Sequence, residues 1–358
     1  MTLRIEIDRS TPVHKGAAGG HNRWHPDIPP VAGVDPGEAV TFEVRDSRDR
    51  TLTRASTHAD LLATPSLAHP LTGPLEVRGA EPGDLLEVEI LGYETDDFGW
   101  TAIWPGSGWL GDLFEHPFLA RWELDDRCAR SEELPGVAVP AGVFAGVIGV
   151  APSRDLFERA REREAALADR GGAFDLPSPE LAAPPEAGDG LRTFPPRENG
   201  GNMDIRDLVA GAKLWLPVFV PGALLSIGDL HFAQGDGEVC ISAIETSGTA
   251  SVRVDVVRDG PRMRFPSWES PARPGRRCFA STGIPLDDWG NNADRDLNLA
   301  TRRALLELLD WLTSEGGLRR EAAYVLMSGA AELRISEVVD APNALVSAAL
   351  PLDVFEEG

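Results

Sequence analysis

The sequence predicts an α+β fold that is predominantly β, with a β-sandwich-like core and helices concentrated in the C-terminal third. Through most of the chain, apolar residues occur in short alternating or continuous runs bounded by Gly, Pro, Asn and Asp, a pattern typical of strands joined by turns. The clearest helical periodicity comes late, over Asp294–Thr313, where Leu297, Ala304 and Leu308 fall on one face. Strands and helices separated along the chain in this way favour the α+β class.

Composition excludes several classes of protein. A chain of 358 residues with 42% hydrophobic residues can bury one large core or two moderate ones. The net charge of −23 argues against a nucleic-acid partner, because a phosphate backbone requires a basic face. No apolar run approaches the roughly 18 residues that span a bilayer, and the N-terminus lacks the pattern of a signal peptide. We therefore expect no membrane partner and a cytoplasmic location.

The first part of the chain is expected to consist mainly of strands. One begins at Thr2, another lies within Asp35–Ser47, and two more flank the turn within His69–Glu94. Arg48–Ala63 is polar and fits a short helix or a loop over a site. Asp96–Trp122 shows neither helical nor strand period, so we expect a long ordered loop there.

The middle of the chain combines a strand, a helix and an insertion. The strand is expected within Val137–Val150, and a charged helix over Asp155–Arg170 with Ser153 as its N-cap. Phe174–Arg197 is rich in Pro, Ala and acidic residues and is expected to run over the surface. These segments suggest three parts of one intertwined globular unit: residues 1–150 (β-rich), 151–200 (helix and insertion) and 201–358 (site-bearing strands and C-terminal helices).

The last part alternates again before it becomes helical. Ser251–Val257 reads as a half-exposed strand. Gly316 and Gly317 end the late helix, a second short helix is expected over Leu318–Met327, and strand-like runs close the chain.

The densest group of reactive side chains lies within Gly222–Glu245. Apolar runs at Ala223–Ile227 and Val239–Ile244 predict two buried strands joined by a polar, glycine-rich connection. Four side chains that can bind a metal or move protons fall within this connection: Asp229, His231, Asp236 and Glu238. A solvated surface loop is the alternative, since Asp-Gly pairs are common in hairpin turns. The density of functional groups between two apolar runs favours a site.

A metal-dependent hydrolase is the sharpest hypothesis for these residues. Zn²⁺ takes His nitrogen and carboxylate oxygen ligands, leaves a position for water and lowers the pKa of that water toward ~7. His231, Asp229 and Asp236 supply such ligands, and His69 can complete the set if the fold brings it alongside. Glu238 is the candidate general base.

Other interpretations stay open. Cys240 could be a nucleophile, although buried cysteines are usually small apolar residues. Carboxylates in a glycine loop can also hold Ca²⁺ as a structural ion. The chain could instead be a small-molecule or metal-binding β protein without activity, because fold does not guarantee function. The segment His14–Pro30, with Trp24 and His25, fits a loop that lines a pocket.

Four blocks of sequence, in order, resemble the acetamidase/formamidase family. They are HNRWHPDIPP (residues 21–30), HPLTGPLEVRGAEPGDLLEVEI (69–90), GGNMDIRDL…LWLPVFVPGALLSIGDLHFAQGDGEV (200–208 and 214–239) and AAYVLMSGAAELRISEVVD (322–340). The resemblance runs over nearly the whole chain. It implies hydrolysis of a short-chain aliphatic amide, such as formamide or acetamide, to a carboxylate and ammonia. It also implies a β-rich bacterial cytoplasmic enzyme that forms homo-oligomers and, in some members, binds metal.

Residue roles are assigned partly by this resemblance. The residues carried over from family motifs are His69, Asp204, Asp229, His231, Asp236 and Glu238. The residues assigned to catalysis are Glu238, Asp236 and His231. Those assigned to a divalent cation, expected to be Zn²⁺, are His69, Asp229, His231 and Asp204. Those assigned to the amide substrate are His25, Trp24, Gln234 and Asn202.

Two positions depart from the family pattern. SRDRTLTR (residues 47–54) stands where the family often has a GGQ or DGQ step, and Glu332 stands where many members have aspartate. The first departure can alter the pocket, so a larger or more specialised amide is a candidate substrate.

Overall fold

The structure is a computed structural model that describes residues 2–8, 10–63, 69–107, 115–133, 138–170, 179–234, 238, 240–271, 277–317 and 332–352. The strands are β1 (Leu3–Ile5), β2 (Gly20–His21), β3 (Arg23–Trp24), β4 (Ala32–Val34), β5 (Ala39–Val44), β6 (Leu71–Val77), β7 (Leu85–Ile103), β8 (Phe118–Leu124), β9 (Cys128–Arg130), β10 (Ala138–Pro140), β11 (Phe144–Val150), β12 (Leu191–Arg192), β13 (Gly200–Asn202), β14 (Lys213–Pro217), β15 (Leu225–Ala233), β16 (Ile244–Val257), β17 (Ser267–Ser270), β18 (Cys278–Gly283), β19 (Glu332–Glu337) and β20 (Leu345–Pro351). The helices are α1 (Asp60–Ala63), α2 (Arg154–Asp169), α3 (Leu297–Ser314) and three 3₁₀ turns, η1 (Val13–Lys15), η3 (Pro179–Leu181) and η4 (Pro185–Ala187). Strands hold 40% of the described residues and helices 15%, which confirms the predominantly β class.

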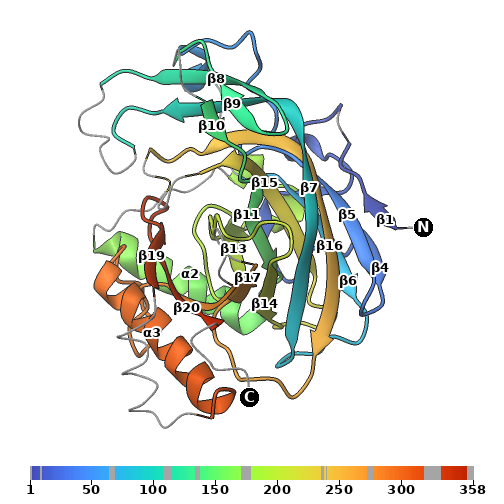
Figure 1. Cartoon of the computed structure of the whole chain (residues 1–358), viewed down its shortest axis with the longest axis vertical. Helices are drawn as coiled ribbons and strands as arrows, with labels where there is room; N and C mark the ends of the chain where they lie inside the picture. The colour runs from blue at the N-terminus through green and yellow to red at the C-terminus, as the bar shows by residue number, and fades with distance from the viewer. Residues whose placement is uncertain are drawn as a thin grey trace.

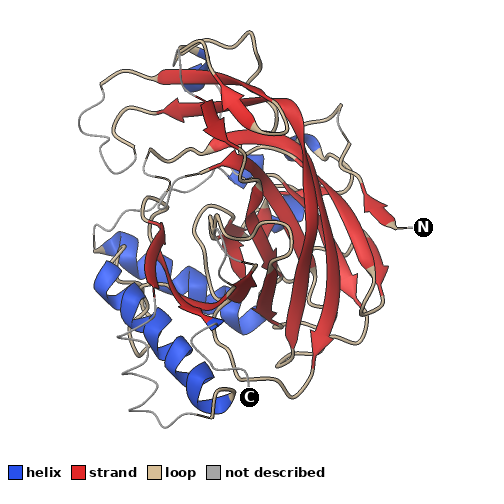
Figure 2. Cartoon of the chain, in the orientation of Figure 1, coloured by secondary structure: helices blue, strands red, loops and turns tan. Residues whose placement is uncertain are grey.

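Most strands pair antiparallel and form two layers around one large core (Figures 1 and 2). The long strands β7 and β16 pair with each other and, on their outer sides, with β14 and β5. The second layer joins β6, β15, β11 and β13. The largest cluster of buried apolar side chains takes members from both layers: Val40, Phe42, Val88 and Val252 from the first, and Leu75, Ile148, Leu225 and Ile227 from the second. Such interleaving is typical of a β-sandwich-like core.

β15 is a buried strand that is paired on both sides. It pairs with β11 on one side and β6 on the other, and its last residues pair with the start of β16. All of its residues are buried. Side chains on such a strand have little freedom to move, which is what a precise site requires.

Both long helices that the sequence predicts are confirmed. The Ser153 hydroxyl caps α2 by accepting a hydrogen bond from the N–H of Leu156 (3.1 Å). Asp296 caps α3, whose apolar face packs against β18 and β20. None of the described helices combines the length and hydropathy needed to cross a membrane. The predicted helix over Leu318–Met327 lies outside the described residues.

The expected loop over Asp96–Trp122 is wrong at both ends. β7 continues to Ile103 and β8 begins at Phe118, and the two strands pair over residues 98–103 and 118–123. Polar and aromatic side chains share the partly exposed face of β7 here, which hides the alternation. Pairing with neighbouring strands, rather than local pattern, extends β7.

The site-bearing strand is also longer than expected. β15 runs through Asp229 and His231 to Ala233, whereas the sequence suggested an end at Ile227. The following strand begins at Ile244 rather than Val239. Polar residues inside β15 read as a loop in sequence, but pairing with β11 buries them.

The expected surface course of Phe174–Arg197 fails for its last residues. Leu191, Arg192 and Arg197 are at most 3% exposed. Arg197 Nε lies 2.6 Å, and Arg192 Nη2 3.5 Å, from the carboxylate of Glu164 on α2. Ion pairing allows these polar residues to be buried, which composition alone could not show.

Candidate active site

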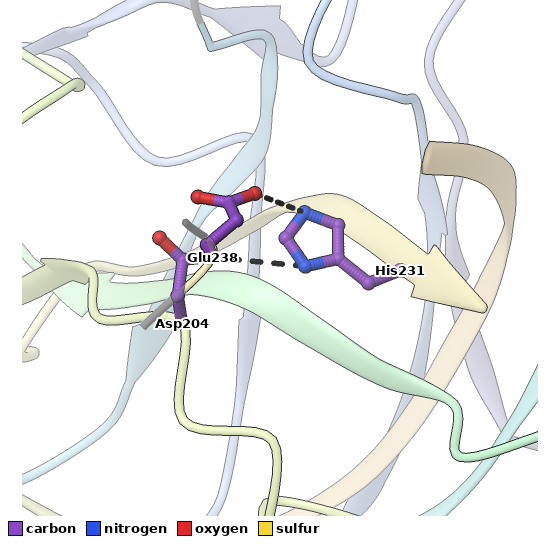
Figure 3. Close-up of side chains that lie close together, drawn as sticks. All are labelled: Asp204, His231 and Glu238. Carbon is purple, nitrogen blue, oxygen red and sulfur yellow. Dashed lines mark ion pairs between the residues drawn. The ribbon is translucent and has the colours of Figure 1, made fainter. Parts of the chain in front are cut away.

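A buried group of histidines and carboxylates surrounds His231. Asp229 lies two residues earlier on the same face of β15, and Glu245, at the start of β16, pairs directly opposite His231. Glu238 and Asp204 reach the ring from loops (Figure 3). Exposed fractions run from 0% for His231 to 7% for Glu238, so water is largely excluded from these side chains.

A cavity of about 230 Å³ opens onto this group. Its polar side is lined by Ser47, His69, Asn202, Asp229, Glu238, Glu245 and Asp340. Its other side is lined by Arg48, Trp104, Ser107, Phe194 and Ile241. A small concave space with converging polar groups and a partly apolar wall is typical of a small-molecule site.

Three of the carboxylates sit on left-handed backbone. The φ angles are 48° at Asp204, 58° at Asp229 and 45° at Glu238. Residues other than glycine adopt this region at a cost of roughly 1–3 kcal/mol each when the surrounding structure imposes it. Three such residues gathered around one histidine indicate a functional constraint.

β11 approaches the group closely at Gly146. A Cβ at this position would lie 2.5 Å from Asp204 Oδ1, 2.9 Å from His231 Cε1 and 3.0 Å from Asp229 Oδ2. Only glycine leaves room for all three side chains, which gives a physical reason for a glycine inside this strand.

The hydrogen bonds of His231 fix its tautomer. Nδ1 lies 2.9 Å from Gln234 Oε1, and the Gln234 amide N–H donates to the backbone oxygen of Asp204 (3.1 Å). Since an amide oxygen only accepts, Nδ1 carries a proton. Nε2 then points toward carboxylate oxygens of Asp229 (3.2 Å), Glu245 (3.6 Å) and Glu238 (4.0 Å).

The carboxylates around His231 Nε2 favour a positive charge at this position. Burial alone would lower the pKa of His231, but Asp229 and Glu245 raise it to about 10. Nε2 has no hydrogen-bond partner within the described part of the chain. Either a proton or a metal cation between Nε2 and the carboxylates relieves their repulsion.

The donor set fits a metal cation. Two overlapping groups have ligand atoms within 4.8 Å of one another: Asp229, His231 and Glu245, and Asp204, His231 and Glu238. Both Asp204 carboxylate oxygens and Asp229 Oδ1 are buried without a hydrogen-bond partner among the described residues. A histidine whose second nitrogen donates to an oxygen, as His231 does to Gln234, is typical of metal ligands.

His69 stands beside this group. Its Nε2 lies 3.6 Å from Asp229 Oδ2, and its ring stacks on Phe194 with centroids 5.9 Å apart. Burial lowers the pKa of His69, which favours the neutral form that binds metals. The fold therefore brings His69 alongside β15, as its proposed role as a ligand requires.

Glu238 has the properties of a proton carrier. It lines the cavity, and burial raises its pKa to about 7. A carboxyl group that titrates near neutrality can both accept and release a proton. Asp236, also assigned to catalysis, lies outside the described residues.

A second pair of buried polar residues faces the cavity from β13 and the β19–β20 turn. The Asn202 side-chain N–H donates to Asp340 Oδ2, while Asn202 Oδ1 is without a partner in the described ranges. The N–H of Asp340 donates to Glu337 Oε1 (2.6 Å). Asn202 therefore presents a free acceptor beside the carboxylates.

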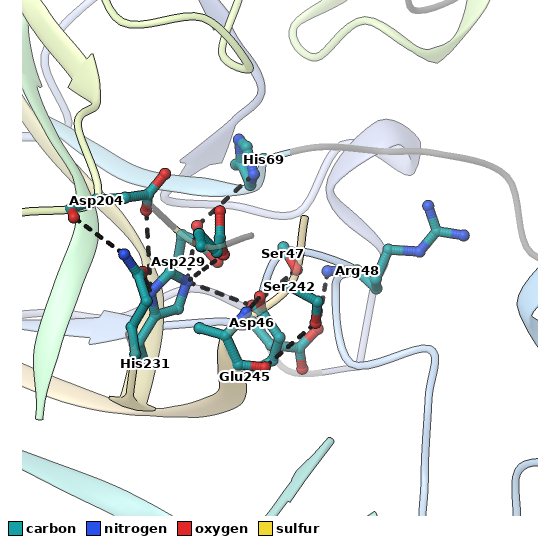
Figure 4. A network of polar contacts seen from close by, with 12 residues as sticks. Asp46, Ser47, Arg48, His69, Asp204, Asp229, His231, Ser242 and Glu245 are labelled. Atoms are coloured by element: carbon teal, nitrogen blue, oxygen red, sulfur yellow. Dashed lines mark hydrogen bonds and ion pairs between the residues drawn. The ribbon is translucent and has the colours of Figure 1, made fainter. Parts of the chain in front are cut away.

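The first departure from the family pattern borders the site (Figure 4). Ser47 and Arg48 line the cavity, and the Ser47 hydroxyl donates to Glu245 Oε2 (2.8 Å). Figure 4 shows the Arg48 side chain directed away from His231. The second departure, Glu332, is half-exposed and accepts a hydrogen bond from Arg334 (2.7 Å).

Some predicted substrate residues lie elsewhere. Trp24 packs in a hydrophobic cluster with Phe157 of α2, and His25 contacts Phe157 with ring centroids 4.9 Å apart. Gln234 orients His231 instead of lining the cavity. Asn202 is the member of that set that faces the cavity. Loop composition placed Trp24 and His25 at a pocket, but α2 covers them.

Sequence reasoning missed Glu245, Glu337 and Asp340 as site residues. Glu245 and Asp340 each follow two apolar residues, Glu337 precedes two, and each of the three is at most 2% exposed. A carboxylate next to strand-forming apolar residues was the available signal, because charged groups are seldom fully buried without a role. Strand pairing, which no local pattern encodes, places Glu245 opposite His231, and the turn between β19 and β20 brings Asp340 to the cavity and Glu337 to Asp340.

The surroundings of Cys240 disfavour the thiolate form that a nucleophile needs. Burial raises the pKa of its thiol to about 11, and its Sγ lies 3.3 Å from the backbone oxygen of Ser242. Reactive cysteines have lowered pKa values, because the thiolate is the nucleophile. This environment suits an inert thiol.

Comparisons with known proteins agree over the whole chain. Residues 6–357 match the sequence profile of the Acetamidase/Formamidase family. The chain is 34% identical to a formamidase from Methylophilus methylotrophus over 99% of its own length and 93% of the relative. It is 35% identical to an acetamidase from Mycolicibacterium smegmatis, covering 90% and 88% of the two chains. The solved structure of a gamma lactamase from Delftia acidovorans is similar, with a TM-score of 0.73, 32% identity and coverage of 99% and 94%.

Proposed function

The chain belongs to the acetamidase/formamidase family, and we propose that it hydrolyses a short-chain aliphatic amide to a carboxylate and ammonia with water activated by a divalent cation. The observation that supports the metal-dependent part is His231 Nε2, which lies within 4.0 Å of three carboxylates and has no hydrogen-bond partner among the described residues. The small cavity beside it supports a substrate of amide size.

The residues that would hold the cation are Asp229, His231 and Glu245, with His69 and Asp204 beside them. When bound, such a cation supplies a Lewis acid that polarises the amide carbonyl and lowers the pKa of water. The mixture of imidazole and carboxylate favours Zn²⁺, whereas Ca²⁺ takes oxygen ligands alone.

Glu238 transfers the proton. In its ionised form it takes a proton from water as the water oxygen bonds to the amide carbon. The same carboxyl group then gives that proton to the amide nitrogen as the C–N bond breaks, so that ammonia leaves. A pKa of about 7 suits both steps. Asn202 Oδ1 would accept a hydrogen bond from the substrate –NH₂ and orient the leaving group.

No observation favours the two rival functions. A thiol amidase is disfavoured by the raised pKa of Cys240. Left-handed backbone occurs at ligand-binding sites as well as at active sites, so product release is the measurement that separates an enzyme from a binding protein without activity. A thiol amidase would lose its activity when its cysteines are alkylated. A binding protein would be stabilised against heat by its ligand but would release no product.

The test is ammonia release by the purified chain from formamide, acetamide and longer amides, together with amino acid formation from a five-membered lactam. The lactam is included because a similar solved structure is a gamma lactamase. We expect ammonia from at least one linear amide, whereas ring opening of the lactam without any ammonia would indicate a different substrate class. Alkylation of the three cysteines should leave the rate unchanged. Failure with all of these substrates would contradict the proposal.

We also infer a homo-oligomer. Leu333 and Ile335 on β19 are 52% and 41% exposed, and β20 is the one partner of β19 among the described strands. An edge strand with exposed apolar side chains is normally covered. Light scattering at micromolar concentration should give a mass of at least twice 38.5 kDa, and a mass of 38.5 kDa would contradict the inference.

A further inference from the structure

One half of the cavity is lined by apolar side chains, and the smallest amides are too short to contact them. Phe194, Trp104 and Ile241 line it opposite the carboxylates. Phe194 and Trp104 are both half-buried, and both line the cavity. Exposed aromatic surface in a small cavity is stabilised when an apolar group covers it.

This apolar half begins immediately beside the site chemistry. The Phe194 ring stacks on His69 at an interplanar angle of 8°, and His69 Nε2 lies 3.6 Å from Asp229. On the far side, the Arg48 guanidinium lies 5.3 Å from the centre of the Trp104 ring. Of the two aromatic rings that line the cavity, Phe194 therefore lies next to the histidine and carboxylate group and Trp104 lies next to Arg48.

The size of the cavity sets the length of that acyl group. At ~30 Å³ per water-sized group, 230 Å³ holds roughly eight such groups. The carboxamide carbon, oxygen and nitrogen, the attacking water and the proposed cation occupy five of these places. Formamide leaves the remainder empty, whereas an acyl chain with about three more carbons fills it.

We propose that this site selects aliphatic amides with about three carbons beyond the carboxamide carbon, with Phe194 and Trp104 as the specificity-determining residues. The proposal rests on the amide hydrolysis proposed above and names its substrate class. Each methylene that enters the apolar half should raise kcat/KM about fourfold, the equivalent of ~0.8 kcal/mol per buried CH₂.

The test is kcat/KM for the straight-chain series from formamide to hexanamide. We expect a rise of about fourfold per carbon to butanamide or pentanamide, followed by a fall. Phe194→Ala should flatten the rise and move the optimum to a longer chain, whereas Phe194→Trp should move it to a shorter one. Phe118→Ala is the matched control, because Phe118 stacks on His58 and does not line the cavity.

Three outcomes would overturn the proposal. One is a rate that is highest for formamide or acetamide and falls with length. Another is an optimum that stays in place in both folded Phe194 variants. The third is a preference for succinamate over butanamide, which would assign the far end of the cavity to an anion at Arg48. If the variants fail to fold, the series with the unaltered chain decides. Absence of ammonia from every amide would overturn the proposed function as well.

Discussion

His231 shows how a single side chain can be specified by its neighbours. Gln234 holds its Nδ1, so that Nε2 faces the carboxylates. Outer partners of metal-binding histidines typically contribute 10–100-fold to metal affinity. We therefore predict that Gln234→Leu lowers Zn²⁺ affinity by about that factor, measured by competition with a chelating dye. Thermal unfolding checks that the variant is folded. Unchanged affinity in a folded variant would show that Gln234 does not act through His231.

Glu238 is the residue on which proton transfer depends. Glu238→Gln keeps the shape of the side chain but removes its ability to accept a proton, so kcat should fall by about 10²–10⁴-fold. KM, bound metal and the melting temperature should change little. Ser107→Ala is a control that alters another residue lining the same cavity. A Gln variant with most of its activity would exclude Glu238 as the general base.

The sequence alone identifies those site residues that lie close together along the chain. Asp229, His231 and Glu238 stand within ten residues, so their density is visible without a fold. Asp340 is more than a hundred residues away, and the β19–β20 turn delivers it to the cavity. Long-range pairing, which residue type does not encode, decides that part of the site.

Among the elements, α2 is fixed to the segment behind the site by buried ion pairs. Arg197 lies 2.6 Å from Glu164, and Arg163 lies 2.6 Å from Glu198. Burial alone would raise the pKa values of Glu164 and Glu198, but the arginines lower both below their usual range. A carboxylate with a lowered pKa stabilises the fold above its unfolded pKa of about 4.3 and loses that contribution as pH falls further.

Glu164→Gln tests this anchor. It leaves a buried arginine without its charge partner, so the free energy of unfolding at pH 7 should fall by about 3–5 kcal/mol. The variant should also lose less stability than the unaltered chain between pH 5 and pH 3, because one of the linked protons is gone. Urea unfolding across this pH range measures both effects. Parallel pH profiles would contradict the assignment.

β11 contributes to the site through the absence of a side chain. Gly146→Ala places a Cβ 2.5 Å from Asp204 Oδ1 and within 3.0 Å of Asp229 Oδ2, so it should displace the ligands. We expect a large loss of kcat/KM and of metal affinity, with a stability cost of about 1–3 kcal/mol. Gly142→Ala is the matched control, because its Cβ would meet nothing within 4 Å. Equal activity in both variants would rule out this role.

The sequence predicts elements where local pattern and packing agree. The alternation in Ser251–Val257 and the capped helices are of this kind. The prediction is wrong for the end of β15, because strand pairing buries its polar residues. It is also wrong for the end of β7, because polar and aromatic side chains hide the alternation there. Both failures occur where tertiary contacts override local preference.

For the molecule as a whole, strand pairing joins segments that are distant in sequence. β6 and β11 from the first 150 residues pair directly with β15 from the last part, and the site lies where these strands meet the start of β16. The α+β class, the sandwich-like core and the family could be predicted from the sequence, because they depend on patterns spread over the chain. The three-part division and the cytoplasmic location stay predictions.

The decisive measurement is ammonia release by one purified sample before chelation, after chelation and after restoration of a single divalent cation, with bound metal counted at each stage. We predict that activity and metal are lost together and that Zn²⁺ restores both. The melting temperature should show that the chain stays folded throughout. Full activity in a folded, metal-free sample would contradict this prediction and would leave this cluster of carboxylates around His231 without its proposed cation.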